Sequence, residues 1–494
     1  MEPITDPRLL VAILTPLLGA GLIMLAGKRP NLREGLSLLA ALSLFGAVLS
    51  LAPRIRAGDT LTWTLFELLP GLSFTLRADA LSMVFALSAS FLWILAVCYS
   101  AGYMRGLGEH AQTRFGACFA LALFGAIGCA FSDNLLTLYL FYEIVSITTY
   151  PLVAHHQDRE GYAGGRKYLA YLTATAKALV LPAMVLLYVL NGNLDFAHDA
   201  SEGVLAGDID RWVVTGLYIA FLIGFAKNGL MPLHQWLPGA MVAPTPVSAL
   251  LHAVAVVKVG VFATVRVMLY IFGTETMAEL NLGLPTAWFV SITIILASLI
   301  ALGKDDLKAR LAYSTVSQLA YIILGVALLT PYGIAGGIIH IANHAFAKIT
   351  LFFCAGAIYV AARRKKISEM HGLGRAMPWT FAAFGIASLS MIGVPGAAGF
   401  ITKWHLLLGS WDAGSMGLIL VLLTSSLLNA AYFGPIVYHG FFGQPPAESE
   451  SPDQAPAREA SPLLVVPLVI TAVISVLIGL FPAFFMQFVQ QVLP

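Results

Sequence analysis

The sequence predicts an all-α polytopic membrane protein with about 14 transmembrane helices. Of its 494 residues, 59% are hydrophobic and only 11% are charged, and the mean hydropathy is +0.83. Apolar runs of about 20 residues, long enough to cross a hydrocarbon core about 30 Å thick, recur along the chain. The runs lack the alternation of β-barrel strands, so each is expected to be a helix.

The apolar runs divide the chain into five parts. In order, the runs cover 9–26, 33–52, 79–102, 113–131, 134–155, 163–190, 210–231, 244–272, 284–303, 308–329, 332–361, 378–410, 416–441 and 463–489. We expect N-terminal helices 1–3 in 1–112, one five-helix group in 113–272, a second in 284–441, a flexible polar linker in 442–462 and a C-terminal helix in 463–494. The linker is rich in Pro, Ser and Glu, a composition that does not support a packed core.

Two of the runs contain helix breakers beside a lysine. Pro232 follows Lys227 in the seventh run, and Pro395 and Gly396 precede Lys403 in the twelfth. Interrupted helices in corresponding positions of two halves are typical of the central site of a transporter. The two runs are five apart, so two inverted five-helix repeats would place them in matching positions. Ordinary proline kinks are the alternative.

One acid and five lysines lie well inside the apolar runs. They are Glu143, Lys177, Lys227, Lys258, Lys348 and Lys403. A charge at mid-bilayer costs about 3 kcal/mol on insertion scales, so such residues usually face a bundle interior or a water-filled path. Desolvation lowers the pKa of a lysine and a nearby carboxylate raises it, so a lysine between these influences can exchange a proton. The sequence leaves open which lysine Glu143 meets, and a static ion pair is the alternative.

The run at 332–361 carries a row of titratable residues. His340, His344 and Lys348 are spaced i, i+4, i+8, which keeps them on one helix face with about 6 Å between successive residues. Histidine titrates near neutral pH, so this row suits a proton relay. Half of a metal site is the alternative for the two histidines, but no third ligand is evident.

Three further residues are expected to assist this row. Ser248 and His252 lie in the same run as Lys258, where they would extend the polar line along that helix. His234 follows the breaker Pro232 by two residues. We treat all three as auxiliary positions for proton transfer.

The sequence predicts no bound cofactor or metal ion in this chain. Its four cysteines are scattered without a C-x-x-C pair, so iron–sulfur and zinc sites are not expected. No G-x-G-x-x-G or phosphate-binding loop is present. We therefore expect no catalytic redox centre here, and membership of a redox-driven enzyme stays open. The expected surroundings are lipid and not nucleic acid.

Charge asymmetry predicts that both termini lie outside. With the N-terminus outside, seventeen Lys and Arg residues fall on inner loops and five on outer loops. The five are Arg8, Arg54, Arg56, Arg77 and Arg211. Because inner loops carry the basic excess in membrane proteins, we expect a multi-pass protein of the bacterial cytoplasmic membrane with both ends outside.

Ordered motifs within residues 75–440 carry a resemblance to a known family. They are Leu-Phe-Tyr-Glu-Ile-Val-Ser at 140–146, Lys-Asn-Gly-Leu-Met-Pro-Leu-His-Gln-Trp-Leu-Pro-Gly-Ala-Met at 227–241, Ala-Pro-Thr-Pro-Val-Ser-Ala-Leu-Leu-His at 243–252, and the segments 306–318, 340–348 and 393–403. The chain closely resembles the proton-pumping antiporter-like family. That family comprises large membrane-arm subunits of respiratory complex I, their counterparts in membrane-bound hydrogenases, and the A-type and D-type subunits of Mrp sodium/proton antiporters.

The resemblance implies inverted five-helix repeats and a role for most of the buried charges. Glu143 is implied to pair with Lys227 on broken helix 7, and Lys258 on helix 8 to be the connecting lysine. The helix-11 histidines continue the central axis, and Lys403 on broken helix 12 is the exit-side lysine. Lys177 on helix 6 matches no family role, which leaves it as a local partner of Glu143.

The resemblance also predicts an ion-translocating subunit of a larger membrane complex, with protons and, as a second candidate, Na⁺ as the ions. A short chain with lysine at position 403 is most like the D-type subunit of an Mrp monovalent cation/proton antiporter. The alternative is a membrane-arm subunit of a complex-I-like NADH:quinone oxidoreductase or of a membrane-bound hydrogenase, since N-type subunits share both traits. A quinone-binding redox subunit and an inactive scaffold are minor alternatives. The expected partners are other membrane subunits.

Overall fold

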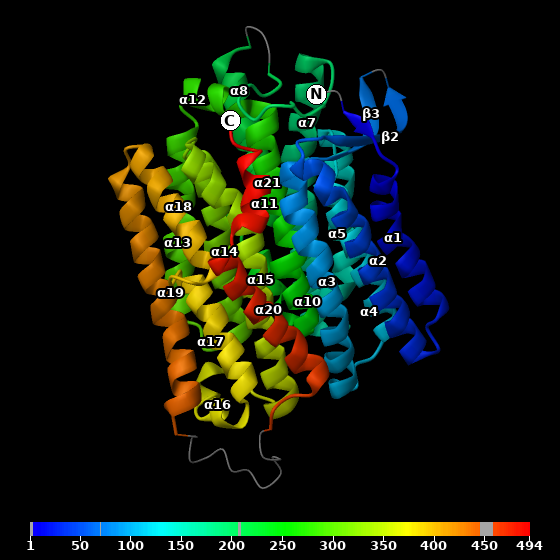
Figure 1. Ribbon diagram of the computed structural model, residues 1–494, viewed down its shortest axis with the longest axis vertical. Coiled ribbons are helices and arrows are strands. Elements are labelled where there is room, and N and C mark those ends of the chain that lie inside the picture. The colour runs from blue at the N-terminus through cyan, green and yellow to red at the C-terminus, as the bar shows by residue number, and fades with distance from the viewer. Residues whose placement is uncertain (1–2, 70, 206–208, 445–457) are drawn as a thin grey trace.

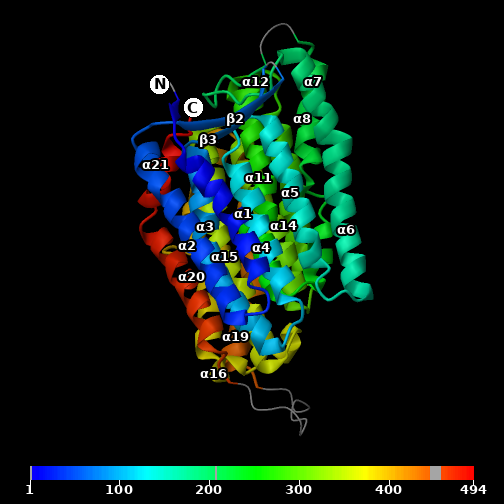
Figure 2. The ribbon, with the colours of Figure 1, turned by 90° about the vertical axis from the view of Figure 1, so that its right-hand side faces the viewer.

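The computed structural model describes residues 3–69, 71–205, 209–444 and 458–494. It is a bundle of long helices that run nearly parallel to one another (Figure 1). The N-terminal strand β1 (Ile4–Thr5) and the C-terminal helix α21 (Ala483–Gln490) lie at one end of the bundle. The short helix α16 (Leu373–Ala376) lies at the opposite end in both views (Figures 1 and 2).

The helices follow the chain in the order of the apolar runs. They are α1 (Arg8–Leu25), α2 (Pro30–Arg56), α3 (Ala80–Leu107), α4 (Gln112–Ala130), α5 (Leu135–Val153), α6 (Arg159–Thr175), α7 (Leu181–Asn191), α8 (Arg211–Gly224), α9 (Trp236–Gly239), α10 (Thr245–Ala249), α11 (Val256–Val267), α12 (Gly273–Glu279), α13 (Gly283–Leu302), α14 (Leu307–Ala327), α15 (Pro331–Ala362), α17 (Pro378–Ile392), α18 (Ala398–Asp412), α19 (Met416–Phe442) and α20 (Pro462–Leu480). Short 3₁₀ turns cover Ala226–Asn228, Ala240–Val242 and Ile367–Glu369, and π-helical turns cover Ala176–Val180, Leu250–Val254 and Met268–Phe272.

Each predicted apolar run coincides with a helix or an interrupted helix. Within the described residues, 11 helices are long and apolar enough to cross a membrane, when helices joined by π-helical turns are taken as continuous. Helices α8 and α17 are apolar but shorter. The helical membrane architecture is therefore confirmed, whereas the total of 14 crossings, the domain boundaries and the inverted five-helix repeats stay predictions.

The two predicted helix interruptions are present. The seventh run leaves the helix after Gly224, and Gly229 adopts a φ of 73°. The twelfth run is divided into α17 and α18, and Gly393 and Gly396 between them have φ values of 90° and 88°. Glycine enters this left-handed region at little cost, so these glycines allow the chain to leave one helix and begin another.

A three-stranded sheet, which the sequence did not predict, adds to the helical architecture. Strand β2 (Leu61–Leu69) pairs in parallel with β1 and antiparallel with β3 (Leu72–Ala78). The sheet lies across one end of the bundle (Figure 2). In the chain, β1 precedes α1, whereas β2 and β3 lie between α2 and α3. The sequence of this segment alternates around a Pro-Gly pair, which is a hairpin pattern. The hairpin was not predicted, because only apolar runs long enough to span a membrane were considered.

Buried ion pairs join the sheet to the helices at this end. Asp79 caps α3 and accepts hydrogen bonds of 2.5 and 3.0 Å from Arg266 of α11. Arg77 of β3 lies 3.2 Å from Asp79 and 3.5 Å from Asp133. Burial raises the pKa of the Asp79 carboxyl, but the charges of Arg266 and Arg77 outweigh burial and hold that pKa well below its usual range. This network therefore has a structural role.

Two helices form the centre of the bundle. Every residue of α11 is buried, and so is every residue of α15 from Gly333 to Ile358. A helix that is apolar all round is expected to be enclosed by others. Polar side chains on these two helices therefore lie in the interior, as their places in the apolar runs predicted.

The predicted linker at 442–462 lies mainly outside the described residues. Helix α19 ends at Phe442 and α20 begins at Pro462. Both positions lie at the end of the bundle opposite β1 and α21 (Figure 1). This arrangement is consistent with the predicted topology, in which the linker and the two termini lie on opposite sides of the membrane.

Candidate functional site

Lys227 lies in the first helix interruption. The 3₁₀ turn Ala226–Asn228 carries it, and its side chain is fully buried. Its Nζ donates a hydrogen bond of 2.8 Å to the carbonyl oxygen of Tyr142 and lies 3.1 Å from the centre of the Tyr142 ring. An ammonium over an aromatic face is attracted by the ring's negative face. Tyr142 of α5 therefore supplies two contacts that hold this lysine.

Backbone groups freed by the interruption are bound by side chains. The Asn228 amide donates to the carbonyl oxygen of Leu222 at 2.9 Å, and the Trp236 indole donates to that of Ala226 at 3.0 Å. Such carbonyls would be costly if left unpaired inside a membrane. The interruption is therefore a specific, hydrogen-bonded structure, which is more than the proline kink that was the alternative.

A glycine on α11 allows that helix to pack against the interruption. A Cβ added at Gly260 would overlap the carbonyl carbon of Lys227 and the amide nitrogen of Asn228. No side chain fits in this space. Helix α11 therefore contacts directly the backbone that carries Lys227.

Glu143 acts on Lys227 through its charge. Lys227 has the larger electrostatic effect on the Glu143 carboxylate, and Lys177 has the next largest. Among the described residues Glu143 has no direct ion pair, and its Oε1 atom is buried without a hydrogen-bond partner. Glu143 and Lys227 therefore form no direct ion pair among the described residues, and their functional pairing stays a prediction.

Lys177 departs from the expectation that buried-run lysines face the interior. It lies in the π-helical turn Ala176–Val180, and its side chain is exposed on the surface of this chain. Helices α6 and α7, which flank the turn, form one edge of the bundle (Figure 2). Its charge still reaches Glu143. An apolar run shows that a residue lies at membrane depth, but only the packing shows which way it faces.

A row of polar side chains joins α11, α15 and α18. The Nζ of Lys258 lies 2.8 Å from Nδ1 of His344, and the rings of His344 and His340 are 5.6 Å apart at their centres. Nδ1 of His340 lies 3.1 Å from the hydroxyl of Thr402, which directly precedes Lys403. We call these five residues the central row. All five side chains are buried.

Lys403 ends the central row at the second helix interruption. Its Nζ donates hydrogen bonds to the carbonyl oxygen of Ile392 at 2.7 Å and to the hydroxyl of Ser426 at 2.8 Å. Ile392 is the last residue of α17, where carbonyl groups lack partners within the helix. A Cβ at Gly393 would lie 2.5 Å from Cδ of Lys403, so glycine gives the lysine stem room to pass.

Lys348 forms a branch beside the central row. Its Nζ donates to the hydroxyl of Ser314 at 2.9 Å. The same Ser314 oxygen accepts a hydrogen bond of 3.2 Å from Tyr432. The predicted spacing along α15 is therefore correct, but Lys348 points to α14, whereas the histidines point to α11 and α18.

The three auxiliary residues are not joined to the row by direct contacts. His252 lies in the π-helical turn Leu250–Val254, with its ring centre 4.7 Å from that of Phe352. The ring nitrogens of His252 and His234 and the hydroxyl of Ser248 are buried without partners among the described residues. Unpaired buried polar atoms are costly unless water reaches them.

A polar cavity of about 540 Å³ lies at the end of the bundle opposite β1. Its walls include Glu109, Asp158, Thr245 and Lys308. Thr245 belongs to α10 and Lys308 to α14, and Nζ of Lys308 donates to the carbonyl oxygen of Ala243, just before α10, at 2.6 Å. The polar cavity therefore approaches the interior residues from one end of the bundle.

Comparison with known proteins identifies the family. Residues 132–429 match the family described as NADH:quinone oxidoreductase/Mrp antiporter, TM. The matched region contains both helix interruptions and the whole central row. The chain belongs to this family.

Relatives of this antiporter-like chain come from two kinds of complex. Subunit N of the NADH-quinone oxidoreductase of Desulforudis audaxviator is 33% identical over 91% of this chain and 90% of its own length. Na⁺/H⁺ antiporter subunit A1 of Staphylococcus haemolyticus is 30% identical over 91% of this chain but 57% of its own length. A chain of the Mrp complex from Dietzia sp. DQ12-45-1b has the same fold, with a TM-score of 0.87 at 22% identity and coverage of 98% and 96%. These relatives do not single out the D-type antiporter subunit that the sequence favoured.

Several contact residues of this antiporter-like chain were not identified from sequence. Thr402, Tyr142, Ser314 and Ser426 each contact one of the predicted ionisable residues. Hydroxyl side chains are common in membrane helices and show no distinctive spacing. Tyr142, Ser314 and Thr402 lie within the motifs at 140–146, 306–318 and 393–403, which could have drawn attention to them, whereas Ser426 lies in none of the motifs.

Replacement of Gly260 by alanine is expected to disturb the Lys227 interruption. The added methyl group would overlap the backbone of Lys227, and overpacking of this kind costs about 1–3 kcal/mol. The measurement is thermal unfolding of the purified chain in detergent. Gly216→Ala on α8 is the control, because a Cβ there meets nothing within 4 Å. Equal unfolding midpoints for the two variants would contradict the close packing.

Proposed function

We propose that this chain transfers protons across the membrane along the central row, as one subunit of a larger complex. The observation that carries the proposal is the row itself, in which Lys258, His344, His340 and Thr402 follow one another through the buried centre of the bundle. Lys403 is the next residue after Thr402 on α18, and its side chain is buried as well. Lysine and histidine can carry a proton on the side chain itself. When charged they repel a metal cation such as Na⁺, so protons are the favoured ion.

The central row offers a defined order of proton transfers. A proton on Nζ of Lys258 can pass to Nδ1 of His344 over 2.8 Å. Transfer from His344 to His340 needs a bridging water, because the ring centres are 5.6 Å apart. The hydroxyl of Thr402 can accept a proton from His340 and donate its own onward, since a hydroxyl is both acceptor and donor. The step from Thr402 to Lys403 also needs bridging water, because adjacent side chains on a helix do not face each other and no contact joins these two among the described residues. Lys403 would receive the proton between the Ile392 carbonyl and Ser426.

Glu143 and Lys227 would control the charge beside this row. A nearby carboxylate favours the charged form of a lysine, so protonation of Glu143 would favour release of the proton from Lys227. No contact joins Lys227 to Lys258 among the described residues, but Gly260 holds the two elements together. Coupling between the two segments would therefore be electrostatic or mediated by water.

The relatives favour a complex of the NADH-quinone oxidoreductase type. A subunit N aligns over 90% of its own length, whereas the antiporter subunit A1 aligns over 57%. An Mrp-type complex is the second candidate, supported by the 30% identity to that antiporter subunit. In both cases the partners would be other membrane subunits. Purification of the complex through a tag on this chain distinguishes the two candidates. NADH–quinone reduction by the purified complex would indicate the first, and Na⁺/H⁺ antiport without NADH would indicate the second.

Replacement of Glu143 by glutamine or of Lys227 by alanine is expected to reduce proton transport about 100-fold or more while the complex still assembles. Lys227→Arg is expected to fail as well, because arginine keeps its proton. The assay is proton uptake by proteoliposomes that contain the purified complex. Lys177→Ala is the control and is expected to lose much less, since Lys177 is exposed and has the smaller effect on Glu143. Wild-type transport by Glu143→Gln would contradict the pairing.

Replacement of Lys403 by alanine is expected to remove most proton transport in the same assay. Lys403→Glu is expected to keep part of it, because a buried carboxylate can also bind and release a proton. His405→Ala is a matched control two residues further on α18, since Nδ1 of His405 contacts the carbonyl oxygen of Ile401 in its own helix. Near-normal transport by Lys403→Ala would show that the central row is not the path.

The chain is a multi-pass membrane protein, and we propose that both termini lie outside the bacterial cytoplasmic membrane. Reporter fusions within 442–462 are expected to read cytoplasmic, and fusions at either terminus are expected to read external. The matched fusion at Gly372, beside α16, should agree with the linker, because α16 lies at that end of the bundle (Figure 1). A cytoplasmic signal from either terminus would contradict this orientation.

A further inference from the structure

Two loops at the end of the bundle that contains the polar cavity bring one acid and three histidines together. Glu109 and His110 follow α3, and His155 and His156 follow α5. One ligand atom from each of Glu109, His110 and His155 lies within 4.8 Å of the other two. The rings of His110 and His155 are 4.7 Å apart at their centres. We call Glu109, His110 and His155 the loop cluster.

Two of the distances within this group are too long for hydrogen bonds and close to the distances between ligands of one metal ion. Oε2 of Glu109 lies 3.7 Å from Nε2 of His155 and 3.6 Å from Nδ1 of His156. A hydrogen bond between such atoms would be about 2.7–3.2 Å long. Tetrahedral Zn²⁺, with ligand bonds of about 2.0–2.2 Å, holds its donor atoms about 3.3–3.6 Å apart. Small movements of the side chains would complete that geometry.

His155 provides an independent observation that points to a ligand. Its side chain is fully buried, and neither ring nitrogen has a hydrogen-bond partner among the described residues. An unpaired buried polar atom costs about 1–3 kcal/mol. Arg114 donates to the carbonyl oxygen of His155 at 2.9 Å, so it binds the main chain of His155 and not its ring nitrogens. Coordination of a metal ion would use one of them.

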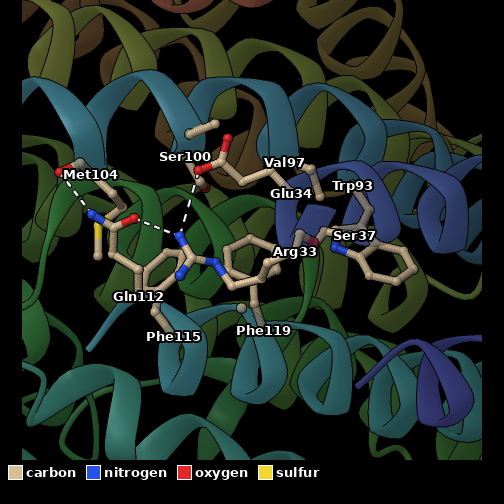
Figure 3. Close-up of a pocket in the computed structure, with 12 residues that line it drawn as sticks. Arg33, Glu34, Ser37, Trp93, Val97, Ser100, Met104, Gln112, Phe115 and Phe119 are labelled. Carbon is tan, nitrogen blue, oxygen red and sulfur yellow. Dashed lines mark hydrogen bonds and ion pairs between the residues drawn. The ribbon is translucent and has the colours of Figure 1, made fainter. Parts of the chain in front are cut away.

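The first loop is held in position by a neighbouring network. Arg33 of α2 donates to the side-chain oxygen of Gln112 at 2.7 Å, and Gln112 donates to the carbonyl oxygen of Met104 at 3.4 Å (Figure 3). The Gln112 amide also donates to the carbonyl oxygen of Glu109 at 3.0 Å. This network borders a separate small cavity between α2, α3 and α4. Because the backbone of Glu109 is already ordered, little entropy is lost when its side chain binds an ion.

We propose that the loop cluster binds a divalent transition-metal ion, for which Zn²⁺ is the best match. One carboxylate and two imidazoles form a ligand set that Zn²⁺ prefers, with a fourth position open to water or to His156. His110 is exposed, which gives the ion a way in. No metal site was predicted from the sequence, because only the four cysteines and the pair His340 and His344 were considered as ligands, whereas this cluster joins loops about 45 residues apart.

The loop cluster borders the polar cavity, so a bound ion would affect transport. Glu109 and His156 both line that cavity. A divalent charge at its wall would repel protons that enter toward Lys308. This consequence rests on the proposed function, whereas metal binding itself does not. On that basis Zn²⁺ slows proton transport from the cavity side.

The test uses the purified full-length chain, first treated with a chelator and then titrated with ZnCl₂ by calorimetry. Co²⁺ in place of Zn²⁺ reports the coordination through its visible absorption. The wild type is expected to bind one ion per chain, and Glu109→Gln and His110→Gln are each expected to weaken binding at least about tenfold. His110 is exposed, so its variant remains informative if a substitution at buried His155 prevents folding.

His371→Gln is the matched control. The rings of His371 and His439 are also 4.7 Å apart, but no described acid completes a group of three ligands there. The control is expected to bind Zn²⁺ like the wild type. Absence of binding by the wild type, or wild-type affinity in both loop-cluster variants, would overturn the proposal.

Proteoliposome transport separates the two parts of the inference. Each variant's rate with Zn²⁺ is compared with its own metal-free rate. Slowing of the wild type and not of His110→Gln supports control through the loop cluster. Binding without slowing overturns that control and leaves the metal site intact. Absence of metal-free transport in the wild type would instead contradict the proposed function, while calorimetry would still decide the site.

Discussion

The central constraint on this structure is that buried lysine ammonium groups must find hydrogen-bond acceptors in the protein, because little water is present at membrane depth. Lys227 and Lys403 each donate to a main-chain carbonyl oxygen, that of Tyr142 in one case and that of Ile392 in the other. A charged side chain at membrane depth persists only with such partners. The carbonyl of Ile392 is available because α17 ends there, so the second interruption provides the partner of its own lysine. The interruptions and the lysines are therefore parts of one arrangement.

This arrangement constrains the packing of the helices around it. Breaking a helix exposes peptide groups, which Asn228 and Trp236 bind at the first interruption. The neighbouring helix must also come close enough to exclude lipid, and Gly260 permits that approach. At the second interruption Gly399 has the same role, since a Cβ there would overlap the carbonyl oxygen of Ser390. Small residues replace apolar bulk where backbones must touch.

The charges of the chain are divided between separate places. At the end near β1, Asp79 pairs with Arg266 and Arg77 in a closed network, which suits a structural role. In the centre, few carboxylates lie near the lysines and histidines of the row. Their charged forms are therefore not held by an opposite charge, and these side chains can gain and lose a proton. At the opposite end, the polar cavity and the loop cluster gather charged and titratable groups, of which His110 is exposed and His155 is buried. Ion transfer and its control would therefore involve the centre and this last end.

The sequence by itself determined the membrane architecture, the two interruptions and most of the ionisable residues of the site. Long apolar runs, Gly and Pro at the breaks and lysines inside the runs are local features, and each has a direct physical consequence that needs no knowledge of the neighbours. The sheet at 61–78 was also readable from local alternation, but it is too short and too polar to resemble a membrane span. The resemblance of the motifs also allowed the family to be inferred from the sequence.

Only the tertiary structure decided which of these residues meet. It placed Lys258 against His344 and turned Lys348 toward Ser314, although the spacing on α15 treats the histidines and Lys348 alike. It put Lys177 on the surface and brought Glu109 and His155 together from different loops. The physical reason is that spacing along one helix defines a face, whereas the partner of that face depends on how other helices pack around it.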